Sequence, residues 1–117
     1  MMRGEILQKL RLALPTKESG GIEDMVSDVF GRAKTFTIID IEGKEVEKVA
    51  VIQNPAASYK HGAGPVVVKT LTDLGVTAVI AGEFGPGVST LLEHFNVAKI
   101  EVKSGTSVSE AIKKYSE

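Results

Sequence analysis

The pattern of apolar and polar positions in the first half of the chain is typical of β-strands. Leucines alternate with other residues over 10–14, and Pro15 is expected to end that strand. β-branched and aromatic residues fill 35–41, which predicts a second strand, and 45–52 has the same strand-forming character. Only the short segment 42–44 separates these two, so we predict that they form an antiparallel hairpin.

In the second half, stretches with the helical apolar period alternate with short apolar runs that are typical of strands. Gly75 and Asn96 are placed to end the first two helices, and the sequence from Ser107 to Glu110 fits a capping box that begins the third. The predicted elements are a helix at 65–74, a strand at 76–81, a helix at 86–95, a strand at 98–102 and a helix at 108–115. The full order is β-β-β-α-β-α-β-α. It predicts an α/β fold with a mixed five-stranded sheet that contains the antiparallel hairpin and has helices packed on it.

Two parts of the chain have no clear period. Residues 15–34 predict a loop of about 20 residues, which is unusual in a compact domain and often functional. Residues 1–9 fit a short helix, an extension of the first strand or a frayed end. With 117 residues and no linker, repeat or low-complexity stretch, the chain is predicted to form a single domain over 1–117.

Composition narrows the classes of function. The chain has 14 basic and 15 acidic residues, so bulk charge gives no reason to expect nucleic-acid binding. No apolar run approaches the roughly 18 residues that span a membrane, and the first residues lack the features of a signal peptide. Cysteine is absent, which excludes disulfides, zinc–thiolate sites and a cluster held by four thiolates. We therefore expect a cytoplasmic protein that binds neither nucleic acid nor membranes.

Two Gly-Pro pairs, Gly64-Pro65 and Gly85-Pro86, precede the first two predicted helices. Glycine lets a ligand approach the backbone, and proline at the first helical position starts a helix without wasting a donor. The free N–H groups of the first turn and the positive end of the helix dipole then favour an anion. Together with the neighbouring histidine, the two helix starts predict a site for a polyanionic ligand. The candidate cofactor-binding residues are His61, Gly62, Gly64, Gly85, Gly87 and Arg32, of which His61 is also the candidate metal ligand.

Five short motifs occur in an order and spacing that resemble one known family. They are Val-Ser-Asp-Val-Phe-Gly-Arg-Ala at 26–33, Phe-x-Ile-Ile-Asp at 36–40, Asn-Pro-Ala at 54–56, His-Gly-Ala-Gly-Pro at 61–65 and Ala-Gly-x-x-Gly-Pro-Gly at 81–87. Over residues 10–115 the chain resembles the dinitrogenase iron-molybdenum cofactor biosynthesis family, which includes NifX-like carriers and the carboxy-terminal domain of NifB. The resemblance implies a ribonuclease H-like three-layer fold. It also implies binding of an anionic metal–sulfur cluster or its precursor.

The chain departs from the family pattern at one residue. In relatives tied to nitrogen fixation, the residue before the Phe-Gly of the first motif is often histidine, whereas here it is Val29. Valine has no lone pair to offer a metal, so one ligand that the resemblance implies is missing. His61 occupies the second histidine-bearing position.

Each candidate also has an interpretation that involves no ligand. His61 fits a solvated loop residue as well as a metal ligand. Arg32 could clamp an anion, or it could pair with Asp24 or Asp28 and fix the long loop. Tight turns need glycine whether or not anything binds. Phe30 is expected to anchor that loop in the core.

Two other polar residues are expected to have no role in the site. His94 falls on the polar side of its predicted helix and is expected to be exposed. Asp40 is expected near the end of its strand, in contact with solvent.

These features favour a small carrier for an iron–sulfur or iron-molybdenum-type cluster, held transiently, rather than an enzyme. The alternative is a non-catalytic assembly or regulatory partner that binds a simpler anion or another protein. Cofactor-assembly proteins are the partners that the resemblance implies. A metal-dependent hydrolase is disfavoured because the first strand has no acid, where nucleases of this fold need carboxylates.

The sequence leaves the oligomeric state open. Four charged residues are expected to discourage edge-to-edge pairing of the hairpin: Lys44, Glu45, Glu47 and Lys48.

Overall fold

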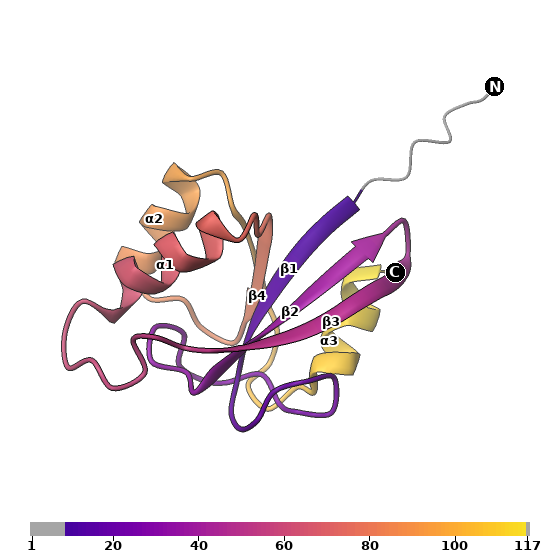
Figure 1. Ribbon diagram of the computed structural model, residues 1–117, viewed down its shortest axis with the longest axis horizontal. Helices are drawn as coiled ribbons and strands as arrows, with labels where there is room; N and C mark the ends of the chain where they lie inside the picture. The colour runs from indigo at the N-terminus through magenta and orange to yellow at the C-terminus, as the bar shows by residue number, and fades with distance from the viewer. Residues whose placement is uncertain (1–8, 117) are drawn as a thin grey trace.

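The computed structural model describes residues 9–116, which form a mixed five-stranded open sheet and three helices (Figure 1). The elements are β1 (Lys9–Thr16), β2 (Thr35–Glu42), β3 (Glu45–Gln53), α1 (Ala63–Asp73), β4 (Ala78–Ala81), α2 (Pro86–His94), β5 (Ala98–Glu101) and α3 (Val108–Ser116). The predicted order of elements is confirmed. The strands lie in the order β3-β2-β1-β4-β5; the β1–β2 and β2–β3 pairs are antiparallel, and the β1–β4 and β4–β5 pairs are parallel.

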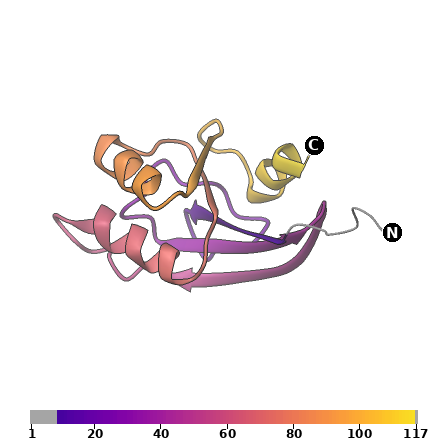
Figure 2. The same ribbon diagram turned by 90° about the horizontal axis from the view of Figure 1, so that it is seen from above.

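Successive residues of the central strands belong to two different cores, because side chains alternate between the faces of a sheet. Ala13 lies in one core with Leu71 of α1, and α2 contributes to the same core. Leu12 and Ile80 lie in the other core with Ile112 of α3. Figure 2 shows the α1–α2 pair at one end of the molecule and α3 at the other. The sheet is therefore packed between α1 and α2 on one face and α3 on the other.

Pro15 does not end β1, contrary to the sequence-based expectation. The strand continues to Thr16, and Pro15 lies opposite Phe36 in the antiparallel ladder. The carbonyl oxygen of Pro15 accepts a hydrogen bond of 2.8 Å from the N–H of Ser27, which lies outside the β1–β2 ladder. The nitrogen and carbonyl of one strand residue point to the same side. The missing N–H of Pro15 therefore costs no bond to β2.

Helix α1 also begins earlier than predicted, at Ala63 rather than Pro65. Gly62 has a φ of 75° and turns the chain into the helix, and the side chain of Ala63 is buried. Pro65 becomes the third helical residue. It loses nothing there, because the first N–H groups of a helix have no acceptor within the helix. Strand β4 begins two residues later than predicted, at Ala78.

The predicted helix ends are confirmed. Gly75 has a φ of 80° just beyond α1, and Asn96 has a φ of 60° just beyond α2. Ser107 caps α3, since its hydroxyl accepts a hydrogen bond of 3.2 Å from the N–H of Glu110. The predicted second helix, 86–95, included Phe95. In the structure Phe95 instead follows the last residue of α2 and is 46% exposed.

The segment between β1 and β2 is the predicted loop, and Asp24 organises it. The Asp24 carboxylate accepts hydrogen bonds of 2.8 Å from the N–H groups of Glu18 and Gly20, and one of 2.7 Å from its neighbour Met25. Asp24 therefore fixes the first half of this loop. From the sequence, Arg32 was a candidate for fixing the loop.

Asp40 lies near the end of β2 with 25% of its side chain exposed, as expected, and it is also ion-paired, which the sequence did not predict. Its carboxylate accepts a hydrogen bond of 2.7 Å from Nε of Arg11, on the neighbouring strand. This bond lowers the pKa of Asp40 below its ordinary value. Arg11 also donates from Nη1 to the carbonyl oxygen of Leu74, at 2.6 Å, and so ties β1 to the end of α1. Within the described residues, no helix has the length and apolar character to cross a membrane.

Candidate functional site

Three segments that lie far apart in the sequence meet around a pocket of about 460 Å³, which we call the Phe30 pocket. One is the end of the long loop, one is the turn into α1, and one is the turn from β4 into α2. Five of the six candidate residues line this pocket, and Gly87 does not. The lining residues are Asp28, Val29, Phe30, Gly31, Arg32, Lys60, His61, Gly62, Ala63, Gly64, Glu83, Phe84, Gly85 and Val88.

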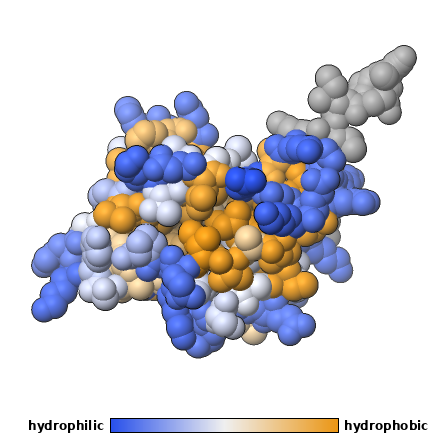
Figure 3. Space-filling model, viewed as in Figure 1, coloured by the Kyte–Doolittle hydropathy of each residue, from blue (hydrophilic) through white to orange (hydrophobic). Residues whose placement is uncertain are grey.

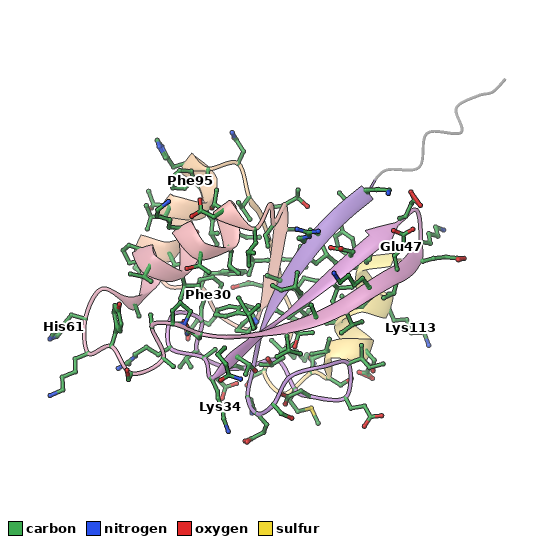
Figure 4. The ribbon with its side chains drawn as sticks, in the orientation of Figure 1. Phe30, Lys34, Glu47, His61, Phe95 and Lys113 are labelled. Carbon is green, nitrogen blue, oxygen red and sulfur yellow. The ribbon has the colours of Figure 1, made fainter. Side chains whose placement is uncertain are left out.

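Phe30 lines the pocket and also belongs to the core. Its ring lies edge-on to that of Phe36, with 5.4 Å between centroids, and 6.0 Å from that of Phe84. Only 4% of Phe30 is exposed, and Figure 4 shows its ring between α1 and the sheet. The expectation of a core anchor is confirmed. Because the anchor is fixed, the neighbouring residues of the loop are held at the pocket wall.

Both helix starts contribute to the lining of the pocket, each through the glycine at its N-cap. Gly62 precedes α1 with a φ of 75°, and Gly85 precedes α2 with a φ of 77°. These positive φ values favour glycine whether or not a ligand binds. Pro86 is the first residue of α2, as predicted. The first turns of the two helices carry N–H groups that have no acceptor within the helix, so both can donate to an anion.

Gly64 has a packing role that the sequence does not reveal. A Cβ atom at this position would lie 2.8 Å from Cγ2 of Val88 in α2. A Cβ atom on Gly31 would lie 3.2 Å from the backbone nitrogen of Gly64. The long loop, α1 and α2 therefore approach one another closely at these two glycines. A Cβ atom on Gly87, by contrast, would meet no described atom within 4 Å beyond its chain neighbours and the backbone of its own helix.

The two candidates with polar side chains, His61 and Arg32, are both exposed at the rim of the pocket. Figure 4 shows His61 extending from the loop before α1, away from the body of the molecule. Among the described residues, Arg32 has no ion pair with Asp24 or Asp28, so its guanidinium is available to a ligand. The structure thus places both residues beside the pocket, and neither makes a side-chain hydrogen bond or ion pair to another residue within 9–116.

Three charged lining residues were not identified from the sequence: Asp28, Lys60 and Glu83. Each lies inside or next to one of the motifs, which is the signal that could have found them. Two basic side chains of the lining, Arg32 and Lys60, are balanced by the two carboxylates Asp28 and Glu83. Asp28 is partly engaged, since it accepts a hydrogen bond from the hydroxyl of Ser104. Attraction for an anion must therefore come mainly from the helix N–H groups.

Asn54 connects the pocket wall to the sheet. Its side-chain amide donates to the carbonyl oxygens of Gly31 at 2.9 Å and Ala33 at 2.8 Å. Its oxygen accepts from the N–H of Ala56 at 2.8 Å. Asn54 is buried and directly follows β3. The Asn-Pro-Ala motif is therefore a support of the pocket rather than part of its lining.

Comparison with known proteins shows the family to which the chain belongs. The family model described as dinitrogenase iron-molybdenum cofactor matches residues 9–117. The chain belongs to the dinitrogenase iron-molybdenum cofactor family. An uncharacterized protein of Methanocaldococcus jannaschii is 28% identical over 108 residues, which cover 92% of this chain and 86% of that protein.

Two solved structures extend the comparison. The apo form of the orange protein from Desulfovibrio gigas has a TM-score of 0.77 and 26% identity, covering 90% of this chain and 85% of its own. A Thermotoga protein described as a candidate NifB protein has a TM-score of 0.74 and 36% identity, covering 92% of this chain and 87% of its own. The fold of the chain is thus shared with both of these proteins.

The position at which relatives in this family often have histidine lies in the pocket. Val29 is 50% exposed and lines the Phe30 pocket together with His61. In the part of the chain that the structure describes, no three His, Asp or Glu side chains gather closely enough to hold a metal ion. The lining residues whose side chains could ligate a metal are His61, Asp28 and Glu83.

Proposed function

We propose that this protein carries an anionic metal–sulfur cluster, or a precursor of such a cluster, as transient cargo in the Phe30 pocket. The observation that carries the proposal is the meeting of three family motifs at one pocket whose lining includes the N-cap glycines of two helices. His61 would ligate a metal of the cargo through its imidazole. The N–H groups of the helix starts and Arg32 would bond the anionic sulfur atoms.

The chemistry of the lining favours short residence of the cargo over permanent binding. A single histidine and no cysteine give few protein–metal bonds, and the pocket is open at the rim where His61 and Arg32 lie. A carrier that passes its cargo on needs such a site, and cofactor-assembly proteins would be its partners. We propose that it does this without catalysis, in the cytoplasm.

We also propose that the fold is of the ribonuclease H-like type that the family resemblance implies. The support is the strand order β3-β2-β1-β4-β5, with β2 antiparallel to both its neighbours and helices on both faces of the sheet.

A second candidate function is an assembly or regulatory partner that binds a simpler anion or another protein. The balanced charges of the pocket favour it, because Asp28 and Glu83 oppose a highly charged anion. The two candidates differ in what the purified protein retains: only a carrier holds iron after a gel-filtration step.

The test is an anaerobic titration with an iron–sulfur cluster, followed by desalting and measurement of iron and absorbance. We expect the parent to retain the cluster and His61→Ala to lose it. His94→Ala is the matched control, because His94 is exposed on α2 outside the pocket. Both variants are expected to keep the melting temperature of the parent. Equal retention by His61→Ala would remove His61 from the site, and no retention by the parent would overturn carriage.

A further inference from the structure

The charged side chains of the Phe30 pocket cancel one another. Arg32 and Lys60 supply two positive charges, and Asp28 and Glu83 supply two negative charges. Within residues 9–116 none of the four forms an ion pair, so each charge acts on whatever occupies the pocket. With histidine counted as neutral, the side chains of the lining carry no net charge. A ligand therefore meets carboxylates as well as cations.

Asp28 is held in place by contacts that lie outside the pocket. Its carboxylate accepts a hydrogen bond from the hydroxyl of Ser104, in the loop between β5 and α3. The preceding residue, Ser27, donates its N–H to the carbonyl oxygen of Pro15 at 2.8 Å. These bonds fix the carboxylate of Asp28 and the backbone before it. A bound ligand cannot displace this negative charge without breaking them.

Glu83 extends from an equally fixed segment of backbone, the turn from β4 into α2. Phe84, the next residue, is 9% exposed, and its ring lies 6.0 Å from that of Phe30. On the other side, a Cβ atom on Gly82 would lie 3.6 Å from Cα of Ser104. Glu83 lies between these two close contacts and lines the pocket. Both carboxylates are therefore permanent parts of the pocket wall.

The helix starts add positive charge that the side chains do not cancel. Aligned peptide dipoles give the N-terminus of a helix about half a positive charge. Helices α1 and α2 each contribute the N-cap glycine to the lining, Gly62 and Gly85 respectively. The two ends together amount to about one positive charge. The fixed charge of the pocket thus matches about one negative charge on a ligand.

The rest of the lining disfavours a strongly hydrated ligand. Val29, Phe30, Phe84 and Val88 contribute apolar side chains. Hydrophilic side chains occur at the outer end of the loop before α1 (Figure 3), where Figure 4 places His61. The attraction of an ion to fixed charge grows with its charge, whereas the cost of dehydrating it grows with the square of its charge. A dianion therefore gains about twice the attraction of a monoanion for about four times the dehydration cost.

We propose that Asp28 and Glu83 make the pocket selective for sulfur-covered cargo with about one negative charge, and that they exclude more highly charged anions. The inference rests on the proposed carriage of a cluster and narrows its cargo by charge. The two carboxylates determine specificity because they cancel Arg32 and Lys60 and leave only the charge of the helix starts. Without them the fixed charge would be about three positive charges, which favours a multiply charged anion.

Two tetrahedral thiometallates of nearly equal size test this selectivity: tetrathiorhenate, a monoanion, and tetrathiotungstate, a dianion. Their dissociation constants are measured by anaerobic absorbance titration at low salt. The parent should bind the monoanion more tightly, by about 3-fold or more, because the dianion costs more to dehydrate. D28N/E83Q should shift this preference toward the dianion by about 4–6-fold, since Coulomb's law in water gives about 2-fold per carboxylate at about 8 Å. Asparagine at position 28 keeps an oxygen that can accept the hydrogen bond from Ser104.

The matched control is E45Q/E110Q, which removes two exposed carboxylates that lie outside the pocket. It should keep the preference of the parent. A parent that binds the dianion as tightly as the monoanion would overturn the inference, and so would equal shifts in D28N/E83Q and E45Q/E110Q.

Retention of the iron–sulfur cluster tests carriage separately. A parent that retains the cluster but binds neither thiometallate, or binds both equally, contradicts the selectivity and leaves carriage standing. A parent that retains no cluster overturns both.

Discussion

The side-chain amide of Asn54 donates a hydrogen bond of 2.9 Å to the carbonyl oxygen of Gly31, and so joins the end of the sheet to the wall of the Phe30 pocket. The two residues lie 23 positions apart in the sequence. Gly31 in turn lies against the backbone of Gly64 at the start of α1. A buried amide thus fixes the distance between the long loop and the helix start, the two parts of the site that carry Arg32 and His61.

Replacing Asn54 with alanine is expected to destabilise the protein. Asn54→Ala leaves two buried carbonyl groups and the N–H of Ala56 without their partner. Each unsatisfied group costs about 1–3 kcal/mol, and relaxation recovers part of this, so we expect a loss of about 2–4 kcal/mol in the free energy of unfolding. Urea denaturation measures it. Gln53→Ala, at the exposed neighbouring position, should change stability by less than about 0.5 kcal/mol.

If Asn54→Ala were as stable as Gln53→Ala, the amide would not hold the loop. A destabilised variant should also lose affinity for the cluster more than its unfolded fraction accounts for, because the wall of the pocket is released.

Gly64 and Gly87 are expected to respond in opposite ways to the addition of a methyl group. Gly64→Ala brings a Cβ to 2.8 Å from Cγ2 of Val88, and the stiff valine side chain cannot rotate away freely. We expect a loss of about 1–3 kcal/mol, as for other overpacked sites. Gly87→Ala meets open space in the first turn of α2 and should leave stability unchanged or raise it by up to about 1 kcal/mol.

The double variant Gly64→Ala/Val88→Ala separates overpacking from other effects at Gly64. Removal of the valine methyl groups should make the Gly64→Ala change nearly neutral in that background. An equal cost of Gly64→Ala in both backgrounds would mean that the clash with Val88 is not its cause.

Features that depend on local sequence patterns were predicted correctly, whereas features that depend on tertiary contacts were missed. The order of elements and the ends of the first two helices followed from apolar period, glycine and capping residues, which act within a few positions. The prediction that Pro15 ends the first strand was wrong because its nitrogen points toward Ser27 and away from β2. Only the folded structure reveals this direction. The motifs located most of the pocket lining.

Long-range contacts account for the rest of the site. The packing role of Gly64 depends on Val88, and the role of Asn54 depends on Gly31. Both contacts join segments that come together only through the fold. For the same reason the sequence could not choose between the two interpretations of Arg32, as a clamp for an anion and as a partner of Asp24 or Asp28.

The ion pair between Asp40 and Arg11 should make part of the stability depend on pH. Its hydrogen bond lowers the folded-state pKa of Asp40 below the unfolded value of about 3.9. The stabilisation is therefore complete above the unfolded pKa and is lost as the pH falls through the folded pKa. Asp40→Asn should be less stable than the parent at pH 7, and the difference should shrink on acidification below about pH 4.

The test compares Asp40→Asn with the parent, rather than following the parent alone, because the pKa of Glu47 is shifted in the opposite direction to that of Asp40. A hydrogen bond with Glu42 raises the pKa of Glu47, so the parent profile contains both effects. Asp73→Asn is the control, since Asp73 pairs with Lys69 on the exposed surface of α1 and such pairs contribute little. A stability difference between Asp40→Asn and the parent that did not depend on pH would contradict the assigned ion pair.

The charges at the rim of the Phe30 pocket should tune affinity for an anionic cluster in opposite directions. Glu83→Gln removes a carboxylate from the lining and should tighten binding by about 2–5-fold at low salt, and Arg32→Gln should weaken it by a similar factor. Both effects should diminish as salt rises, because the two side chains are exposed and their charges are screened. Glu110→Gln, on α3 and outside the pocket, is the control for a change in net charge alone. The measurement is the dissociation constant for the cluster, by absorbance titration at two salt concentrations. Equal effects of Glu83→Gln and Glu110→Gln would show that the anion responds to overall charge, and the cargo would then bind elsewhere than in the Phe30 pocket.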